Sequence, residues 1–231
     1  MPVFQLIDEV VFPPPEYAEP NGLLAVGGDL SCERLLEAYR RGIFPWYSDD
    51  QPILWWSPDP RAILELNELR ISRSLRKTLK KNLFNVTFDR AFDRVIDACG
   101  KVPRESQRGT WITDEMQSAY VRLHRQGYAH SVETWYGEDL AGGLYGVSLG
   151  RAFFGESMFH FETDASKVAL TALVQQLHRW QFQFVDAQMT TEHLTSLGAK
   201  EVRRKVFLKR LKEALNHPTR RGLWQIDEAS S

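Results

Sequence analysis

Residues 152–159 read AFFGESMF, a run of aromatic side chains with Glu156 near its centre. The density of aromatic residues predicts a buried strand. An ionised carboxylate in an apolar setting costs several kcal/mol unless a cation or a proton accompanies it. The sequence therefore indicates that Glu156 has a partner, which has to come from another segment or from a ligand.

The segments around this strand determine the fold class. Two extended runs precede it, AHSVETWY at 129–136 and LAGGLYGVSLG at 140–150. A long helix, predicted to be capped by Asp164, follows it and leads to another strand, FQFVDAQM at 182–189. Because strand–helix–strand crossovers are right-handed, residues 182–189 are expected to lie parallel to 152–159 and next to it. The order of elements predicts an α+β fold.

The ends of these two strands bring polar side chains together. Asp186 and Gln188 are two residues apart, so they point to the same face of their strand, and Glu156 lies toward the end of the neighbouring strand. Open sheets bind ligands in this position. Since like charges repel, we expect the partner of the two carboxylates to be a cationic ligand. On spacing alone, a strand-end aspartate that caps the next helix is an equally good interpretation.

Apolar side chains are expected around these polar groups. They come from the strands and from the long helix: Leu144, Met158, Leu170, Leu173, Leu177 and Val185. Apolar residues at helical spacing are usually core. The set is therefore interpreted either as ordinary core or as the wall of an apolar pocket.

The first part of the chain has a different character. PNGLLAVGGDLS at 20–31 is a glycine-bearing turn that ends at Ser31, a predicted helix N-cap. After that helix comes a stretch dense in Trp and Pro, which predicts rigid loops around a short strand. We therefore expect a small N-terminal domain at 1–62 and a larger domain at 63–231, with residue 100 as the alternative boundary.

A basic stripe is predicted on a helix in ISRSLRKTLKK, residues 71–81. Ser72 is its expected N-cap, and apolar residues fall on one side of it. Four cations share the other side at i, i+3, i+4 and i+7, without an acid between them: Arg73, Arg76, Lys77 and Lys80. Most charge runs are solvated surface, but this pattern favours binding to a phosphate backbone by a small margin.

Composition limits the remaining classes. The 231 residues include 29 basic and 30 acidic side chains, so an electrostatic partner has to be bound by a local patch. Cys32 and Cys99 have no second cysteine or histidine at metal-binding spacing beside them, so we expect ordinary reduced thiols. The sequence has neither a long apolar span nor a signal-peptide pattern, which predicts a cytoplasmic protein without a membrane partner.

Several long motifs resemble those of one family. They are EPNGLLAVGGDLS at 19–31, YRRGIFPWYS at 39–48, ILWWSPDPRAIL at 53–64, ISRSL at 71–75, GTWIT at 109–113, GESMF at 155–159, ASKVAL at 165–170 and LTSLGA at 194–199. Over nearly the whole chain they resemble leucyl/phenylalanyl-tRNA–protein transferases. The resemblance implies a small N-terminal domain packed on a C-terminal domain similar to N-acetyltransferases. It also implies transfer of Leu or Phe, with Met as a further candidate, from tRNA to proteins that begin with Arg or Lys, which marks them for degradation.

The same resemblance implies roles for the candidate residues. An aminoacyl ester is already activated, so placement and a free amine are what the protein must supply, and the resemblance implies neither a metal nor a cofactor. Asp186 and Gln188 would hold the α-amine and help move its proton, while Glu156 would face the acceptor's Arg or Lys side chain. The apolar set would hold the transferred side chain. Trp46 and Trp111 would contact the terminal adenosine, and the basic stripe would contact Leu-tRNA and Phe-tRNA.

Two alternatives stay open at this point. An acyl-CoA-dependent enzyme of the same fold should carry a glycine-rich turn between strand and helix for the pyrophosphate. Here that junction reads FHFETDASK at 159–167, which is acidic and has no glycine. A tRNA-binding protein without catalysis would explain the basic stripe and the tryptophans, but it gives no purpose to Glu156, Asp186 and Gln188.

Overall fold

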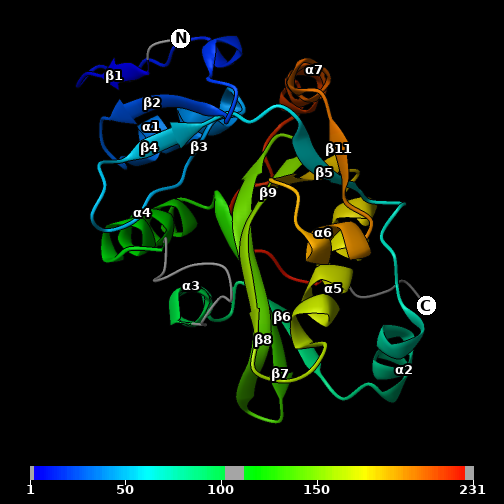
Figure 1. Ribbon diagram of the computed structural model, residues 1–231. Helices are drawn as coiled ribbons and strands as arrows, with labels where there is room; N and C mark the ends of the chain where they lie inside the picture. Colours follow the sequence, from blue (N-terminus) through cyan, green and yellow to red (C-terminus); the bar gives the residue numbers. More distant parts are fainter. Residues whose placement is uncertain (1–2, 102–111, 227–231) are drawn as a thin grey trace.

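The computed structural model describes residues 3–101 and 112–226 of the chain. This part folds into two β-sheets with helices packed against them (Figure 1). The predicted α+β class is therefore confirmed. Among the described residues, no helix has the length and apolar character that a membrane span requires.

The smaller sheet comes from the N-terminal segment. This segment contains β1 (Phe4–Leu6), the short 3₁₀ helix η1 (Pro15–Tyr17), β2 (Leu23–Gly27), α1 (Cys32–Arg40), β3 (Phe44–Pro45) and β4 (Leu54–Trp56). The strand order is β1-β2-β4-β3, with β1 and β2 parallel and the other neighbours antiparallel. Ser31 caps α1 as predicted, because its Oγ accepts a hydrogen bond from the backbone N–H of Arg34 at 3.2 Å.

The larger sheet contains the parallel pair predicted from the sequence. Its strands are β5 (Arg61–Glu65), β6 (Asn85–Phe88), β7 (Ala129–Tyr136), β8 (Asp139–Leu149), β9 (Ala152–His160), β10 (Phe184–Gln188) and β11 (Lys200–Val202). The order is β11-β5-β10-β9-β8-β7-β6. Strands β9 and β10 are parallel neighbours, which confirms the expected crossover, and all other neighbours are antiparallel. The pairing of β5 with β10 is a long-range contact that no local pattern predicts.

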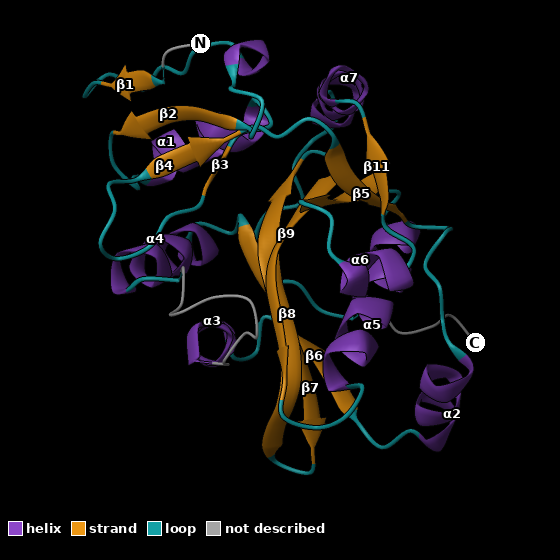
Figure 2. Cartoon of the chain, in the orientation of Figure 1, coloured by secondary structure: helices purple, strands orange, loops and turns teal. Residues whose placement is uncertain are grey.

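Helices cover both faces of the larger sheet (Figure 2). They are α2 (Arg73–Lys81), α3 (Phe92–Lys101), α4 (Asp114–Arg125), α5 (Ala165–Arg179), α6 (Glu192–Ser196) and α7 (Arg204–Leu215). In the view of Figure 1, α3 and α4 lie on one side of the sheet and α5 lies on the other, with α2 outside α5. Thr113 caps α4 and Thr191 caps α6, because their Oγ1 atoms accept hydrogen bonds from the backbone N–H groups of Met116 and Leu194, both at 3.1 Å.

Asp164 does not cap α5 in the predicted way. The helix does begin at Ala165, but Asp164 has a φ of +67° and its side chain makes no capping hydrogen bond. Its carboxylate accepts instead from Lys167 Nζ and from Thr78 Oγ1 of α2, both at 3.0 Å. The predicted capping role is therefore wrong, and the side chain of Asp164 links α2 to α5.

The two sheets share an apolar core. Leu35 of α1 and Trp55 of β4 belong to the same cluster of buried residues as Met116 of α4 and Phe154 of β9. The small and large sheets therefore pack against each other through a continuous apolar interface. A domain boundary at residue 62 stays a prediction.

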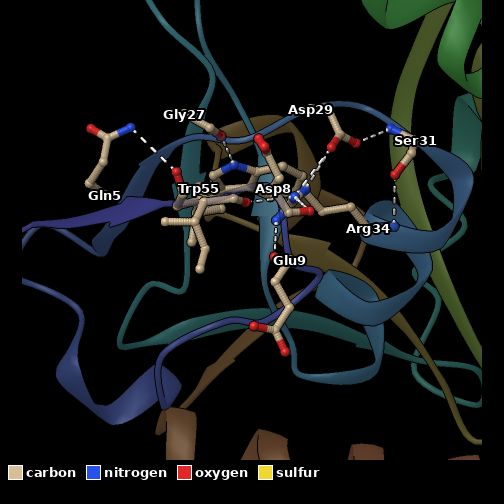
Figure 3. A network of polar contacts seen from close by, with 10 residues as sticks. Gln5, Asp8, Glu9, Gly27, Asp29, Ser31, Arg34 and Trp55 are labelled. Atoms are coloured by element: carbon tan, nitrogen blue, oxygen red, sulfur yellow. Dashed lines mark hydrogen bonds and ion pairs between the residues drawn. The ribbon is translucent and has the colours of Figure 1, made fainter.

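Arg34 holds the N-terminal segment on the small sheet (Figure 3). Its guanidinium is fully buried and donates to the backbone carbonyls of Ile7, Asp8 and Glu9 at 2.9–3.2 Å. The same group donates from Nε and Nη2 to Asp29 Oδ2, at 3.2 Å each. One buried cation thus satisfies carbonyls that follow β1 and connects them to the turn before α1.

We expect Arg34→Met to lower the free energy of unfolding by about 2–4 kcal/mol, because the carbonyls of Ile7, Asp8 and Glu9 and the carboxylate of Asp29 lose their buried donor. Arg40→Met on the same helix is the matched control, since the Arg40 side chain is 47% exposed, and it should change stability by less than about 0.5 kcal/mol. Urea unfolding of both variants measures the difference. Equal losses for the two would refute this role of Arg34.

Candidate active site

The site forms where β9 and β10 separate. The ladder between them ends with Asp186 opposite Phe154. Just beyond, the register of β10 against β5 shifts and Gln188 takes a φ of +64°. The register of β9 against β8 shifts beside Glu156. Such irregularities re-aim side chains, and here they accompany the convergence of Glu156 and Gln188 on one point.

A cavity of about 340 Å³ lies at this separation, within the range of roughly 300–1,000 Å³ that is typical of small-molecule sites. Both Glu156 and Gln188 line it. So do most of the apolar residues singled out from the sequence, together with one tryptophan: Trp46, Leu144, Met158, Leu170, Leu173 and Val185. The cavity therefore combines an apolar wall with a small polar group.

Two of the predicted pocket residues are not found in this wall. Leu177 is fully buried and packs in the core cluster that also contains Leu173 and Val174. It lies one turn beyond Leu173 on α5 and does not reach the cavity, so its predicted role as a pocket residue is wrong. Trp111 lies outside the described residues.

Glu156 is held by hydrogen bonds from three side chains. Tyr39 donates to Oε1 at 2.8 Å, Gln188 Nε2 donates to Oε1 at 2.8 Å, and Tyr120 donates to Oε2 at 3.0 Å. The hydroxyls of Tyr39 and Tyr120 also contact each other. We call these four residues the Glu156 cluster. Two hydroxyl protons can serve only two of the three contacts among the tyrosines and the carboxylate. When Glu156 carries a proton, it can donate to one tyrosine, which then donates to the other, so that all three contacts are served.

Burial governs the protonation of this cluster. It raises the pKa of Glu156 from 4.5 to about 7, and the charge of Asp186 adds to the rise, while the hydrogen bonds from Tyr39, Tyr120 and Gln188 oppose it. Burial also raises the pKa values of both tyrosine hydroxyls well above 10, with the charge of Glu156 as the next contribution. Both tyrosines therefore stay protonated, while Glu156 changes charge near neutral pH.

Gln188 connects the cluster to the cavity. Its Nε2 is bound to Glu156, which fixes the orientation of the amide because a carboxylate oxygen accepts and the NH₂ group donates. Its backbone N–H donates to Asp186 Oδ1 at 3.0 Å, across the turn with positive φ. The amide oxygen is therefore the group of Gln188 that is available as a hydrogen-bond acceptor in the cavity.

Asp186 has a different environment from the one predicted. It is fully buried and is not among the residues that line the cavity. Arg61, also fully buried, donates from Nε to Oδ1 at 2.8 Å and from Nη2 to Oδ2 at 2.7 Å. The cationic partner of Asp186 is thus Arg61 of this chain, and the expectation of a cationic ligand for this carboxylate is wrong.

Sequence reasoning missed Arg61, Tyr39 and Tyr120. Arg61 opens an otherwise apolar strand, RAIL, and a charged residue there could have suggested a buried ion pair. The two tyrosines lie on the buried faces of α1 and α4. Nothing in their local sequence indicates that their hydroxyls meet one carboxylate, because that depends on how two distant helices pack.

The basic stripe has the predicted geometry. Ser72 caps α2 through a hydrogen bond from the backbone N–H of Leu75 at 3.1 Å, and Leu75 is buried. The four predicted cations are exposed: Arg73, Arg76, Lys77 and Lys80. Among the described residues, no acidic side chain forms an ion pair with any of them. The stripe thus presents unpaired positive charge to solvent.

Comparisons with known proteins point to one family. Residues 63–212 match the family described as leucyl/phenylalanyl-tRNA protein transferase, and residues 28–59 match the N-terminal domain described for it. A leucyl/phenylalanyl-tRNA–protein transferase of Anaeromyxobacter sp. (strain Fw109-5) is 58% identical over 98% of this chain and 97% of its own length. One of Solidesulfovibrio magneticus is 57% identical over 98% of this chain and 92% of its own.

Solved structures show more distant similarity. An aminoglycoside acetyltransferase from an uncultured soil metagenomic sample gives a TM-score of 0.38 at 16% identity, over 50% of this chain and 84% of that one. The L-PGS protein of Bacillus licheniformis gives 0.37 at 12% identity, over 74% of this chain and 57% of that one. Structural similarity at this level does not identify a ligand or a reaction.

The raised pKa of Glu156 predicts a specific dependence of stability on pH. The folded state binds the proton more tightly than the unfolded state, so stability falls as pH rises from 4.5 to about 7. Glu156→Gln removes this pH-dependent contribution to the free energy of unfolding. We expect the stability of the variant relative to the native protein to increase by about 2–3 kcal/mol between pH 5 and pH 8.

Urea unfolding at the two pH values measures this change. The exposed Glu213→Gln on α7 is the control, and its stability relative to the native protein should not depend on pH in this way. A pH-independent difference for Glu156→Gln would show that Glu156 does not exchange its proton in this range.

Proposed function

The chain belongs to the leucyl/phenylalanyl-tRNA–protein transferase family and is an aminoacyltransferase, and we propose that it transfers Leu or Phe from tRNA to proteins that begin with Arg or Lys. Met is a further candidate for the transferred residue. The observation that carries the proposal is the cavity between β9 and β10, which joins an apolar wall to Glu156 and Gln188. Because aminoacyl-tRNA is its donor, we place the protein in the cytoplasm.

The apolar wall is the proposed slot for the transferred side chain. Leu144, Met158 and Leu173 offer aliphatic surface, and each buried CH₂ of the donor contributes about 0.8 kcal/mol. Such a wall favours Leu and Phe over small or polar side chains. Because it has no hydrogen-bonding group for the side chain itself, it discriminates between apolar residues only weakly.

The reaction joins the acceptor's α-amine to the carbonyl carbon of the aminoacyl ester. The new C–N bond forms as the C–O bond to the tRNA 3′ end breaks, and the amine's proton passes to the released hydroxyl. An α-amine with a pKa near 8 is about one-tenth unprotonated at pH 7, which costs about 1.4 kcal/mol. Orientation contributes several times more. We propose that the amide oxygen of Gln188 accepts a hydrogen bond from this amine and orients it.

Asp186 acts in this scheme without touching the substrate. Its carboxylate holds the backbone N–H of Gln188, and Arg61 holds the carboxylate. Both are therefore proposed as positioning residues. Trp46 lines the cavity and is proposed to stack on the terminal adenosine, and the four cations of α2 are proposed to contact the phosphate backbone of Leu-tRNA and Phe-tRNA.

Glu156 is proposed to favour an acceptor with a cationic first residue. Three donors already occupy its oxygens. Glu156 therefore attracts the acceptor's cation mainly by its negative charge and only to a lesser extent by new hydrogen bonds. A nearby cation stabilises the ionised form. Binding of such an acceptor thus favours loss of the proton that the cluster carries near pH 7.

The test uses labelled Leu-tRNA and two peptides that differ only in their first residue, Arg or citrulline, its neutral isostere. With the native protein at pH 8, kcat/KM for the Arg peptide should exceed that for the citrulline peptide by about tenfold, or about 1.4 kcal/mol. In Glu156→Gln the ratio should approach one. Appearance of label in the Arg peptide tests the transfer itself.

Two outcomes would contradict the proposal in separate ways. No labelled peptide from native protein, or labelling only with an acyl-CoA donor, refutes aminoacyl-tRNA-dependent transfer. If Glu156→Gln transfers Leu with the native ratio of kcat/KM between the Arg and citrulline peptides, the transferase activity is supported but the proposed role of Glu156 is rejected. The exposed Glu213→Gln should retain the native ratio.

A further inference from the structure

A group of basic side chains surrounds Asp164 between α2 and the cavity. Lys167, in the first turn of α5, donates from Nζ to Asp164 Oδ1 at 3.0 Å. Thr78 of α2 donates to Asp164 Oδ2 at 3.0 Å. These two hydrogen bonds fix the start of α5 beside α2, so the helix with the basic stripe lies next to Lys167.

Two histidines extend this group to the cavity. His193 of α6 lines the cavity, and His160 is exposed at the end of β9. Burial lowers the pKa of His193, and the positive charges of Lys167 and His160 lower it further. Burial alone would raise the pKa of Asp164, but the hydrogen bonds from Lys167 and Thr78 and the positive charges of Lys167 and His160 lower it. The ionisable groups of Asp164, Lys167, His160 and His193 are therefore close enough to influence one another electrostatically.

Basic side chains thus form a track from α2 toward the cavity. It begins with the exposed cations of α2, continues through Lys167 and His160, and ends in the cavity wall at His193, whose imidazole can donate a hydrogen bond to a phosphate without carrying a charge. Helices α2, α5 and α6 lie on the same side of the large sheet in Figure 1. A chain of phosphates that follows the stripe toward the cavity would pass these residues.

We propose that Lys167, His160 and His193 bind the phosphodiester backbone of the single-stranded 3′ end of the aminoacyl-tRNA. This inference rests on the proposed function and adds to it a binding site between α2 and the reacting ester. Contacts to phosphates read no sequence, so the track suits the 3′ end of any tRNA. Asp164 partly neutralises Lys167, which keeps the contact weak enough for release of the discharged tRNA.

The experiment compares two donors in steady-state transfer to an Arg peptide: full-length Leu-tRNA and the leucyl ester of adenosine, which has no phosphate. Lys167→Gln should raise KM for Leu-tRNA by about three- to tenfold, as expected for loss of one phosphate contact, and should leave KM for leucyl-adenosine within twofold. Asp164→Asn should lower KM for Leu-tRNA, because it removes the negative charge. Asn tolerates positive φ, so this variant should fold.

Lys212→Gln is the matched control, since it removes one exposed positive charge from α7 and should change neither KM. Equal rises of both KM values in Lys167→Gln, or no rise in either, would overturn the inference. Failure of the native protein with both donors refutes the proposed function instead. In that case, equilibrium binding of tRNA still tests the track. Lys167→Gln should weaken the binding of intact tRNA but not of tRNA trimmed of its single-stranded 3′ end. Equal weakening for intact and trimmed tRNA would reject the track.

Discussion

The buried ion pair between Arg61 and Asp186 is the constraint on which the site depends. Both side chains are fully buried, and two charge-assisted hydrogen bonds join them. Arg61 also donates to the carbonyl of Gly42 at 3.1 Å and lies over the rings of Phe44 and Phe207, 4.8 and 4.6 Å from their centroids. Removing one partner of such a pair costs about 3–5 kcal/mol, because the other charge stays buried.

This pair connects parts of the molecule that are distant in sequence. It joins the first residue of β5 to β10, and the bond to Gly42 attaches both strands to the segment after α1. From Asp186 the connections continue through the backbone of Gln188 to Glu156, and from Glu156 to helices α1 and α4. The N-terminal segment is therefore part of the candidate site, because its helix α1 supplies Tyr39 to the Glu156 cluster.

Much of this arrangement follows from the sequence. The general rule for strand–helix–strand connections predicts β10 parallel to β9, and the two strands are parallel neighbours. Glu156 and Gln188 are thus brought together by a rule that needs no long-range information. Local capping chemistry likewise predicts the starts of α1 and α2, through Ser31 and Ser72. These features depend on neighbours within a few residues or on the handedness of one connection.

The missed features depend on contacts across the chain. Arg61 and Asp186 are 125 residues apart, and Tyr39 and Glu156 are 117 apart, so no spacing rule joins them. Leu177 shows a second kind of limit, because its periodicity places it correctly on the buried face of α5 but does not say how far the cavity extends along that face. Local sequence therefore predicts a ligand as the partner of Asp186, whereas the partner is Arg61 of the same chain.

We propose that Arg61 acts on the reaction through Gln188. A double-mutant cycle of Arg61→Lys and Gln188→Ala, read as single-turnover rates of transfer from Leu-tRNA to an Arg peptide, measures this coupling. Lysine keeps the charge but loses the paired hydrogen bonds. We predict that Arg61→Lys slows transfer by about tenfold or more when Gln188 is present and has little further effect in Gln188→Ala. The same slowing in both backgrounds would contradict the claim.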